Sequence, residues 1–200
     1  MELVLVRHAE PHRVDVTDHG GPADPALTDR GREQAEALAA WLRDDDVAAV
    51  LTSPLRRAVE TAAPVAAALG HDLEIVDDLA EYDRNSTTYI PIEDLRGTDT
   101  PEWDAMQRGQ LHEVADGDPT AFRQRVVDGI ESIVDRHAGQ TVVVVTHGGV
   151  INAYVGHVLG IDTPLWFEPR YAAVTRVAAQ TTGRRLRSLV TLNEGPRPGC

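Results

Sequence analysis

Two histidines closely follow two strongly apolar runs that lie far apart in the chain. Residues 3–6 lead straight into Arg7 and His8, and residues 142–145 lead, one residue later, into His147. Short β-branched runs of this kind are typical of strands that are buried on both faces. If the two strands are parallel neighbours in one sheet, both imidazoles reach its carboxyl edge beside an arginine. This combination favours phosphate chemistry.

Polar side chains also follow the other two apolar runs. Arg56 and Arg57 come soon after residues 47–51, and Glu81 comes after residues 73–76. Because the carboxyl ends of parallel strands share one edge of a sheet, we expect these groups to converge with the two histidines. Successive residues of a helix point about 100° apart, so only one of the adjacent arginines can face the site. We expect Arg57 there and Arg56 at the surface.

Each of these side chains has a natural role in phosphoryl transfer. A neutral imidazole is a capable nucleophile, which makes His8 the candidate for covalent catalysis. Arg7, Arg57 and a protonated His147 would stabilise the negative charge on the phosphoryl oxygens. Glu81 would protonate the leaving alcohol and later deprotonate the attacking water. The sequence therefore predicts catalytic His8, Glu81 and His147, with phosphate bound by the arginines and His147.

Composition and charge limit the classes of partner. The chain has 200 residues, enough for one domain with a substantial core. Its net charge of −13 disfavours nucleic acid and anionic membrane, and no apolar run approaches the length of a bilayer span. All 19 basic residues are arginines, which bind phosphate in a planar, bidentate way. The single cysteine, Cys200, fits a reducing compartment, so we expect a cytoplasmic protein without a cysteine-based metal site.

Strand and helix patterns alternate along the chain. They predict an α/β fold, a three-layer α/β/α sandwich with a mostly parallel central sheet and an antiparallel edge. Thr28 suits the N-cap of a helix whose apolar positions recur at Ala35, Leu38, Ala39 and Leu42. Further helices are predicted over residues 55–69, from 118 to 139 and over 149–159, and a hairpin over 171–179 and 186–192.

The alternation of strand and helix patterns stops between about residues 80 and 118. This segment holds prolines, glycines, two tyrosines and Trp103 without clear periodicity. Either a lid over the site or a surface excursion would explain it. We therefore expect a single domain over residues 1–200 with a lid or cap insertion at about 80–118.

The ordered motifs resemble those of the histidine phosphatase superfamily, which has the phosphoglycerate mutase-like fold. Arg7-His8-Ala9-Glu10 is similar to the Arg-His-Gly motif of that family. Further similar stretches are Leu27-Thr28-x-x-Gly31-x-x-Gln34-Ala35, Ser53-Pro54-Leu55-x-Arg57-Ala58-x-Glu60-Thr61-Ala62, Leu79-x-Glu81 and Thr146-His147-Gly148-Gly149. The resemblance spans about residues 3–150 and implies a metal-independent phosphatase without a cofactor that forms a phosphohistidine on His8. It also implies phosphate binding by Arg7, Arg57 and His147, with Glu81 as acid and base. We expect Gly148 to bind phosphate as well, because a close turn at Gly148 and Gly149 leaves their amides free near the phosphate.

Departures from the family pattern leave several alternatives open. Ala9 replaces the usual glycine, and Tyr82 starts a run unlike the Phe-Gly-x-Trp-Glu-Gly that often follows the acid. Glu10, or an acid within the lid, can therefore compete with Glu81. A phosphomonoesterase acting on a small phosphorylated substrate, a phosphoglycerate mutase-type phosphotransferase, a metal-dependent hydrolase and a non-catalytic phosphate- or phosphoprotein-binding module all stay under consideration. Apolar side chains near Trp166 and Phe167 favour a homodimer.

Overall fold

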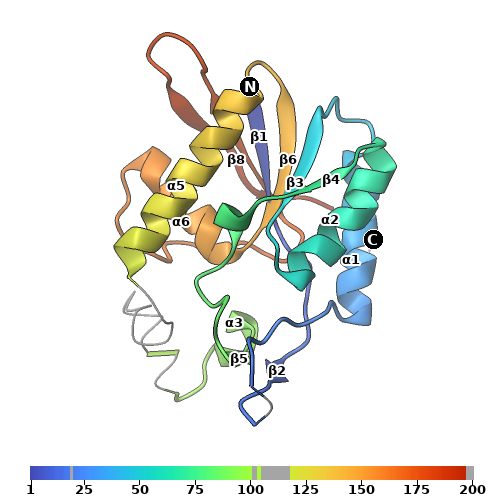
Figure 1. Ribbon diagram of the computed structural model, residues 1–200, viewed down its shortest axis with the longest axis vertical. Helices are drawn as coiled ribbons and strands as arrows, with labels where there is room; N and C mark the ends of the chain where they lie inside the picture. The colour runs from blue at the N-terminus through green and yellow to red at the C-terminus, as the bar shows by residue number, and fades with distance from the viewer. Residues whose placement is uncertain (19, 101–102, 105–117, 197–200) are drawn as a thin grey trace.

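A six-stranded sheet forms the centre of the molecule (Figure 1). The computed structural model describes residues 1–18, 20–100, 103–104 and 118–196. Four neighbouring strands are parallel, β7 pairs antiparallel with β1, and β8 pairs antiparallel with β7. In sheet order the strands are β4 (Leu73–Ile75), β3 (Ala49–Thr52), β6 (Thr141–Thr146), β1 (Glu2–Arg7), β7 (Val174–Ala179) and β8 (Arg187–Glu194). The predicted mostly parallel sheet with an antiparallel edge is confirmed.

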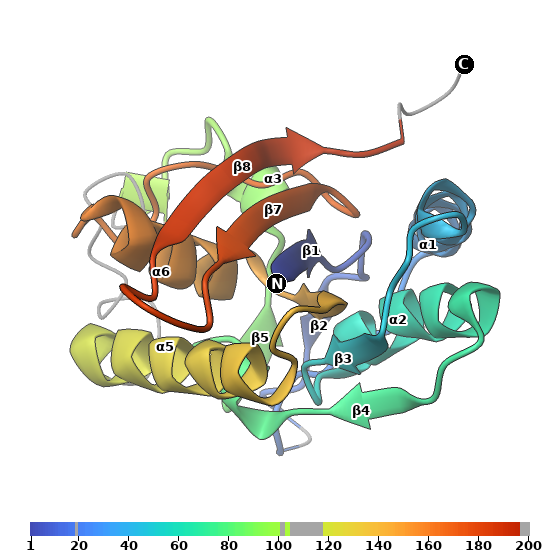
Figure 2. The same cartoon turned by 90° about the horizontal axis from the view of Figure 1, so that it is seen from above.

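Two pairs of helices cover the two faces of the sheet, as Figure 2 shows. Successive side chains of a strand point to opposite faces, so Val4 and Val6 of β1 join one core cluster and Leu3 and Leu5 join the other. The first cluster packs under α1 (Asp29–Leu42) and α2 (Arg56–Leu69), and the second under α5 (Pro119–Arg136) and α6 (Gly148–Leu159). The three-layer arrangement is therefore the predicted one.

Helix ends follow the capping signals in the sequence, with one difference. The hydroxyl of Thr28 accepts a hydrogen bond from the amide of Gly31 at 2.9 Å, and Asp118 caps α5 in the same way. Gly70 ends α2 in the left-handed conformation, with φ 72°. However, α5 ends at Arg136 and not at Gly139. Gly139 has φ 79° and lies in the turn that leads into β6.

Irregular chain lies across the carboxyl edge of the sheet. The 3-10 turn η1 (Asp77–Leu79) follows β4, and β5 (Thr88–Tyr89) pairs antiparallel with β2 (Val14–Asp15), a short strand in the loop after His8. A single-turn helix, α3 (Ile92–Leu95), comes next. Figure 1 shows β2, β5 and α3 below the sheet, where β1 and β6 end. Residues 101–102 and 105–117 of the predicted lid lie outside the described residues.

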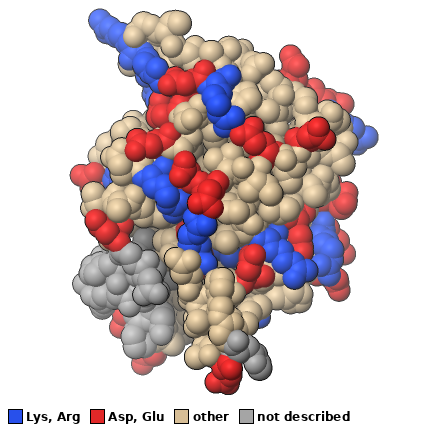
Figure 3. Space-filling view, in the orientation of Figure 1, with Lys and Arg blue, Asp and Glu red and all other residues tan. Residues whose placement is uncertain are grey.

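Charged groups on the surface mostly lie beside groups of opposite sign. On the face seen in Figure 3, arginines alternate with aspartates and glutamates and form no large patch of one sign. Arg176 illustrates this arrangement, because its guanidinium contacts Glu2, Asp45 and Glu194. Within the described ranges, no helix is both long and apolar enough to cross a membrane.

Candidate active site

The two predicted histidines lie side by side. The ring centroids of His8 and His147 are 5.1 Å apart, and both residues are buried, with 3% and 0% of their surface exposed. Arg7 is the register partner of Thr146 in the parallel pair β1 and β6, and the amide of His8 donates to the carbonyl of Thr146 at 2.8 Å. The strand register therefore carries two residues about 140 positions apart to one point.

The hydrogen bond of His8 selects its nucleophilic atom. Nδ1 lies 2.8 Å from the backbone carbonyl oxygen of Ala9, which can only accept, so Nδ1 carries the proton. The lone pair is then on Nε2. Burial, followed by the charges of Arg57 and Arg7, lowers the pKa of His8 well below its usual value. The ring is neutral near pH 7, as a nucleophile toward phosphorus must be.

Both predicted phosphate-binding arginines are almost fully buried beside the histidines. Arg57 is 1% exposed and Arg7 is 5% exposed, whereas Arg56 lies at the surface in an ion pair with Glu60. In the described part of the chain, buried nitrogens without a hydrogen-bond partner include Nε of Arg7, Nε and Nη1 of Arg57, and Nδ1 of His147. An unpaired buried donor costs about 1–3 kcal/mol. A bound oxyanion would remove that cost at several donors together.

His147 differs from expectation in its charge. Its Nε2 lies 2.7 Å from the hydroxyl of Ser53, at the turn after β3. Burial, followed by the charges of Arg57, His8 and Arg7, lowers the pKa of His147 well below its usual value. This arrangement of side chains favours a neutral His147, against the expected protonated ring, and the protonated state stays a prediction. A neutral ring can still donate one hydrogen bond.

Two carboxylates pair with the two arginines, and neither was predicted. Nη1 and Nη2 of Arg7 lie 2.6 and 3.2 Å from the two carboxylate oxygens of Glu93, which also accepts from Tyr171 at 2.7 Å. Nη2 of Arg57 lies 2.9 and 3.2 Å from the carboxylate oxygens of Asp83. Proximity to Glu81 was the only sequence signal for Asp83, and Glu93 had none because an irregular segment carries it.

Glu81 lies in the same site, although the 3-10 turn η1 separates it from the third parallel strand of the sequence. One carboxylate oxygen accepts from the amide of Gly149 at 2.7 Å and the other from the amide of Tyr82 at 3.0 Å. Burial, and next the charge of Asp83, raises the pKa of Glu81 to about 7, against the lowering effect of the two amides. This value suits a group that must both donate and accept a proton near neutral pH.

The two glycines after His147 differ from each other, and only Gly149 departs from expectation. The amide of Gly149 binds Glu81, so it is not free for phosphate, and this part of the prediction is wrong. A Cβ atom on Gly149 would lie 2.3 Å from a carboxylate oxygen of Glu81, which explains the need for glycine there. Gly148 lines the same cavity as His8, Arg7 and Arg57. Its predicted phosphate contact stays a prediction.

Other residues of the quoted motifs hold the loop that follows His8. The amide of Ala9 donates to the hydroxyl of Thr61 at 2.9 Å, and the amide of Glu10 donates to the side-chain oxygen of Gln34 at 2.9 Å. A Cβ atom on Gly31 would lie 2.1 Å from the carbonyl oxygen of Glu10. These motif residues therefore support the nucleophile and do not themselves face phosphate.

The competing acid, Glu10, points away from the histidines. Its carboxylate accepts from the hydroxyl of Thr28 at 3.0 Å and lies 3.7 Å from Nε of Arg30. It lines a groove that does not include His8, whereas Glu81 and His8 line one cavity. The geometry thus favours Glu81 over Glu10 as the acid.

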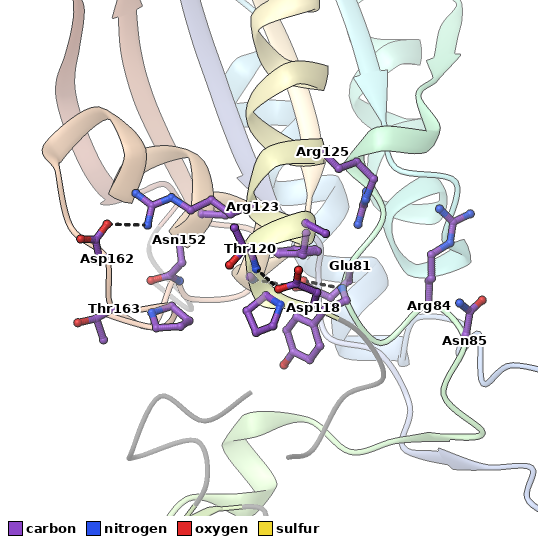
Figure 4. Close-up of a pocket in the computed structure, with 17 residues that line it drawn as sticks. Glu81, Arg84, Asn85, Asp118, Thr120, Arg123, Arg125, Asn152, Asp162 and Thr163 are labelled. Atoms are coloured by element: carbon purple, nitrogen blue, oxygen red, sulfur yellow. Dashed lines mark hydrogen bonds and ion pairs between the residues drawn. The ribbon is translucent and has the colours of Figure 1, made fainter. Parts of the chain in front are cut away.

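Two cavities meet at Glu81. The first has a volume of about 310 Å³ and is lined by His8, both buried arginines and Glu81, with Tyr82, Tyr89, Trp166 and Phe167 around it. The second has a volume of about 630 Å³ and lies between Glu81, the start of α5 and the loop after α6 (Figure 4). Within the described ranges, no group of three or more His, Cys, Asp or Glu side chains has a geometry that could hold a metal ion.

Comparisons with known proteins agree with the site geometry. The sequence pattern of the histidine phosphatase superfamily (branch 1) matches residues 3–192. Phosphoserine phosphatase 1 of Hydrogenobacter thermophilus is 31% identical over 166 residues, covering 81% of this chain and 78% of that protein. The metal-independent phosphoserine phosphatase of Arabidopsis thaliana is 31% identical over 157 residues, covering 76% of this chain and 66% of that protein. The match spans only 40% of each of three longer mycobacterial relatives.

The fold is also similar to that of a solved phosphatase structure. The α-ribazole phosphatase of Shigella flexneri superposes with a TM-score of 0.71 at 25% sequence identity. The superposition covers 97% of this chain and 96% of that one. The likeness therefore includes the antiparallel edge as well as the motifs near residues 3–150.

Proposed function

The chain belongs to the histidine phosphatase superfamily, and we propose that His8 is the nucleophile with which it hydrolyses small phosphomonoesters. The observation that carries this assignment is the neutral imidazole of His8, 5.1 Å from the ring of His147 and flanked by Arg7 and Arg57. Nε2 of His8 attacks phosphorus, and the bond between phosphorus and the ester oxygen breaks. Glu81 gives its proton to that oxygen, so the alcohol leaves neutral.

The second half of the cycle returns the site to its starting state. The carboxylate of Glu81 takes a proton from water, and the resulting hydroxide oxygen bonds to phosphorus as the bond from phosphorus to Nε2 of His8 breaks. Arg7 and Arg57 stay charged throughout and stabilise the equatorial oxygens in both transition states. Glu81 is protonated again at the end, as its pKa of about 7 allows.

The charges around the first cavity support a substrate with a positive group on its alcohol. Arg7 and Arg57 are the only arginines among the described residues that line this cavity, and both already pair with a carboxylate. Asp83 and Glu168 line it as well, and they pair with Arg57 and Arg96. A second anionic group would have to compete with these carboxylates for a guanidinium, whereas an ammonium could share a carboxylate with its arginine. We therefore propose a phosphomonoester whose alcohol carries an amino group. Phosphoserine, in which an ammonium offsets the charge of the carboxylate, is the first candidate because two relatives are phosphoserine phosphatases.

The same charges disfavour the mutase alternative. A mutase must bind a second anionic group and shield the phosphoenzyme from water. Two further arginines that follow the parallel strands already have partners, since Arg56 pairs with Glu60 and Arg84 pairs with Asp77. Arg13 lines a separate groove that does not include His8. Hydrolysis is therefore the reaction that we propose.

Release of inorganic phosphate from matched esters tests this function. The panel contains phosphoserine, phosphoethanolamine, ethyl phosphate and 3-phosphoglycerate, each assayed with and without EDTA. We expect turnover in both conditions, with the two amino esters preferred. A preference for 3-phosphoglycerate, or activity that EDTA abolishes, would contradict the proposal. Phosphate binding without turnover of any ester would support the binding-module alternative instead. A cytoplasmic location and a homodimer stay predictions.

A further inference from the structure

The backbone immediately before Glu81 is held by side chains from two other elements. Each carbonyl of residues 78–80 accepts a hydrogen bond. Arg125 donates through Nη1 to the carbonyl of Asp78 at 2.6 Å and through Nη2 to the carbonyl of Ala80 at 2.8 Å. The hydroxyl of Thr146 donates to the carbonyl of Leu79, between them, at 2.9 Å. Arg125 belongs to α5 and Thr146 ends β6. The path of the chain into Glu81 is thus tied to a helix and to a central strand.

Helix α5 approaches this turn closely enough for a single guanidinium to bridge it. Gly129 lies four residues after Arg125, on the same face of the helix. A Cβ atom at Gly129 would lie 2.5 Å from Cβ of Asp78, which real Cβ atoms do not tolerate. The glycine therefore permits the contact between helix and turn that brings Arg125 to the two carbonyls.

A neighbouring arginine on the same helix has no such contact. Figure 4 shows Arg123 directed toward Asp162, and its Nη1 lies 3.3 Å from that carboxylate. Arg125 points instead toward the segment that carries Glu81. Both arginines line the second cavity, so they share an environment but differ in their partners. Arg123 is therefore a matched control for Arg125.

We propose that Arg125 is a positioning residue for Glu81, an inference that rests on the proposed function. The two amides of Tyr82 and Gly149 fix the carboxyl group itself. Arg125 and Thr146 fix the main chain from which that carboxyl group projects. Proton transfer requires the acid within about 2.6–3.2 Å of the leaving oxygen. A misplacement of about 1 Å can cost about 10²-fold in rate.

Leaving groups of different basicity separate positioning from general stability. Ethyl phosphate needs a proton on its leaving oxygen, whereas 2,4-dinitrophenyl phosphate leaves as a stable anion. We expect R125M to lower kcat/KM by about 10- to 100-fold on ethyl phosphate and by at most about threefold on the dinitrophenyl ester. This parameter reports the steps up to formation of the phosphoenzyme, where Glu81 acts as the acid. R123M should change neither value more than about twofold, since its ion pair is exposed.

Two further variants keep the test decisive if R125M fails to fold. R125K keeps a positively charged donor nitrogen but lacks the second nitrogen that reaches the other carbonyl, so it should lose less activity on ethyl phosphate than R125M does. G129A adds a methyl group that pushes Asp78 and its turn away from α5, and it leaves Arg125 itself unchanged. It should therefore also lower kcat/KM more on ethyl phosphate than on the dinitrophenyl ester. Equal loss on both esters in the folded variants, or no loss on ethyl phosphate, would overturn this inference alone. If the wild-type chain hydrolyses neither ester, the proposed function fails and this inference fails with it.

Discussion

The two halves of the site are built on different kinds of structure. Arg7, His8 and His147 lie at the ends of β1 and β6, and Arg57 lies in the first turn of α2, after β3. The carboxylates come instead from residues 81–93, where the chain forms turns, the two-residue strand β5 and the start of the single-turn helix α3. We call these two groups the basic half and the acidic half of the site. The basic half is held by the regular hydrogen bonding of the sheet. The acidic half depends on individual hydrogen bonds, which leaves its geometry more open to change.

Charge pairing joins the two halves. Asp83 and Glu93 each hold one of the buried arginines, so the two positive charges already have partners. A phosphoryl dianion must share those arginines with the carboxylates or displace them. We infer that the basic half supplies the nucleophile and the charges that bind phosphate, and that the acidic half supplies the proton donor and sets selectivity and the pH range. The following predictions separate these contributions, beginning with the largest effect.

Replacing the acid should produce the largest loss in the acidic half. E81Q keeps the shape of the side chain but cannot give up a proton in the first step. We expect kcat/KM on ethyl phosphate to fall by about 10²- to 10⁴-fold, with a much smaller loss on 2,4-dinitrophenyl phosphate. Steady-state kinetics on the two esters measures this difference. Equal losses on both would remove Glu81 from the role of acid.

The basic half is tested by a pair of adjacent arginines. R57M removes a buried guanidinium, and R56M removes an exposed one that pairs only with Glu60 among the contacts described. We expect R57M to lower kcat/KM by about 10²- to 10³-fold on every ester, whatever its leaving group. R56M should stay close to the wild-type value. Similar losses in the two variants would contradict the assignment of phosphate binding to Arg57.

Phosphate affinity should change when the carboxylate on Arg7 becomes neutral. The side chain of Glu93 is 31% exposed, so its charge is partly screened and its effect is modest. In E93Q we expect inorganic phosphate to inhibit about two- to fivefold more tightly, because it no longer competes with a carboxylate for Arg7. Glu93 does not line the cavity of His8, so the preference for phosphoserine over ethyl phosphate should change less than the inhibition by phosphate does. Unchanged inhibition by phosphate would contradict the competition between Glu93 and phosphate for Arg7.

The smallest effect concerns the alkaline limb of the pH profile. Burial, and next Asp83, raises the pKa of Glu81 to about 7, so kcat/KM on ethyl phosphate should decline as the pH rises through 7 and Glu81 loses its proton. D83N removes a negative charge that favours the protonated acid. The pKa of Glu81 then falls, and the decline begins at a lower pH. If the decline of kcat/KM in D83N began at the same pH as in the wild type, or at a higher one, the influence of Asp83 on the pKa of Glu81 would be contradicted.

The contrast between the halves also explains what could be predicted from the sequence. Apolar strands and capping signals place Arg7, His8 and His147 at one edge, because regular hydrogen bonding leaves few alternatives for their positions. Glu81 was identifiable by its distance from the third strand, although η1 intervenes. The pairing of Glu93 with Arg7 depends on the path of an irregular segment, which no periodicity encodes. The neutral state of His147 depends on burial by distant elements and was likewise inaccessible.

Trapping the covalent intermediate tests the central claim most directly. The wild-type chain is mixed with ³²P-labelled phosphoserine, quenched within milliseconds and digested, and the labelled peptide is identified. We predict an acid-labile, alkali-stable phosphate on His8, and no label and no turnover in H8A. A label on another residue, an alkali-labile linkage, or normal turnover by H8A would contradict the account.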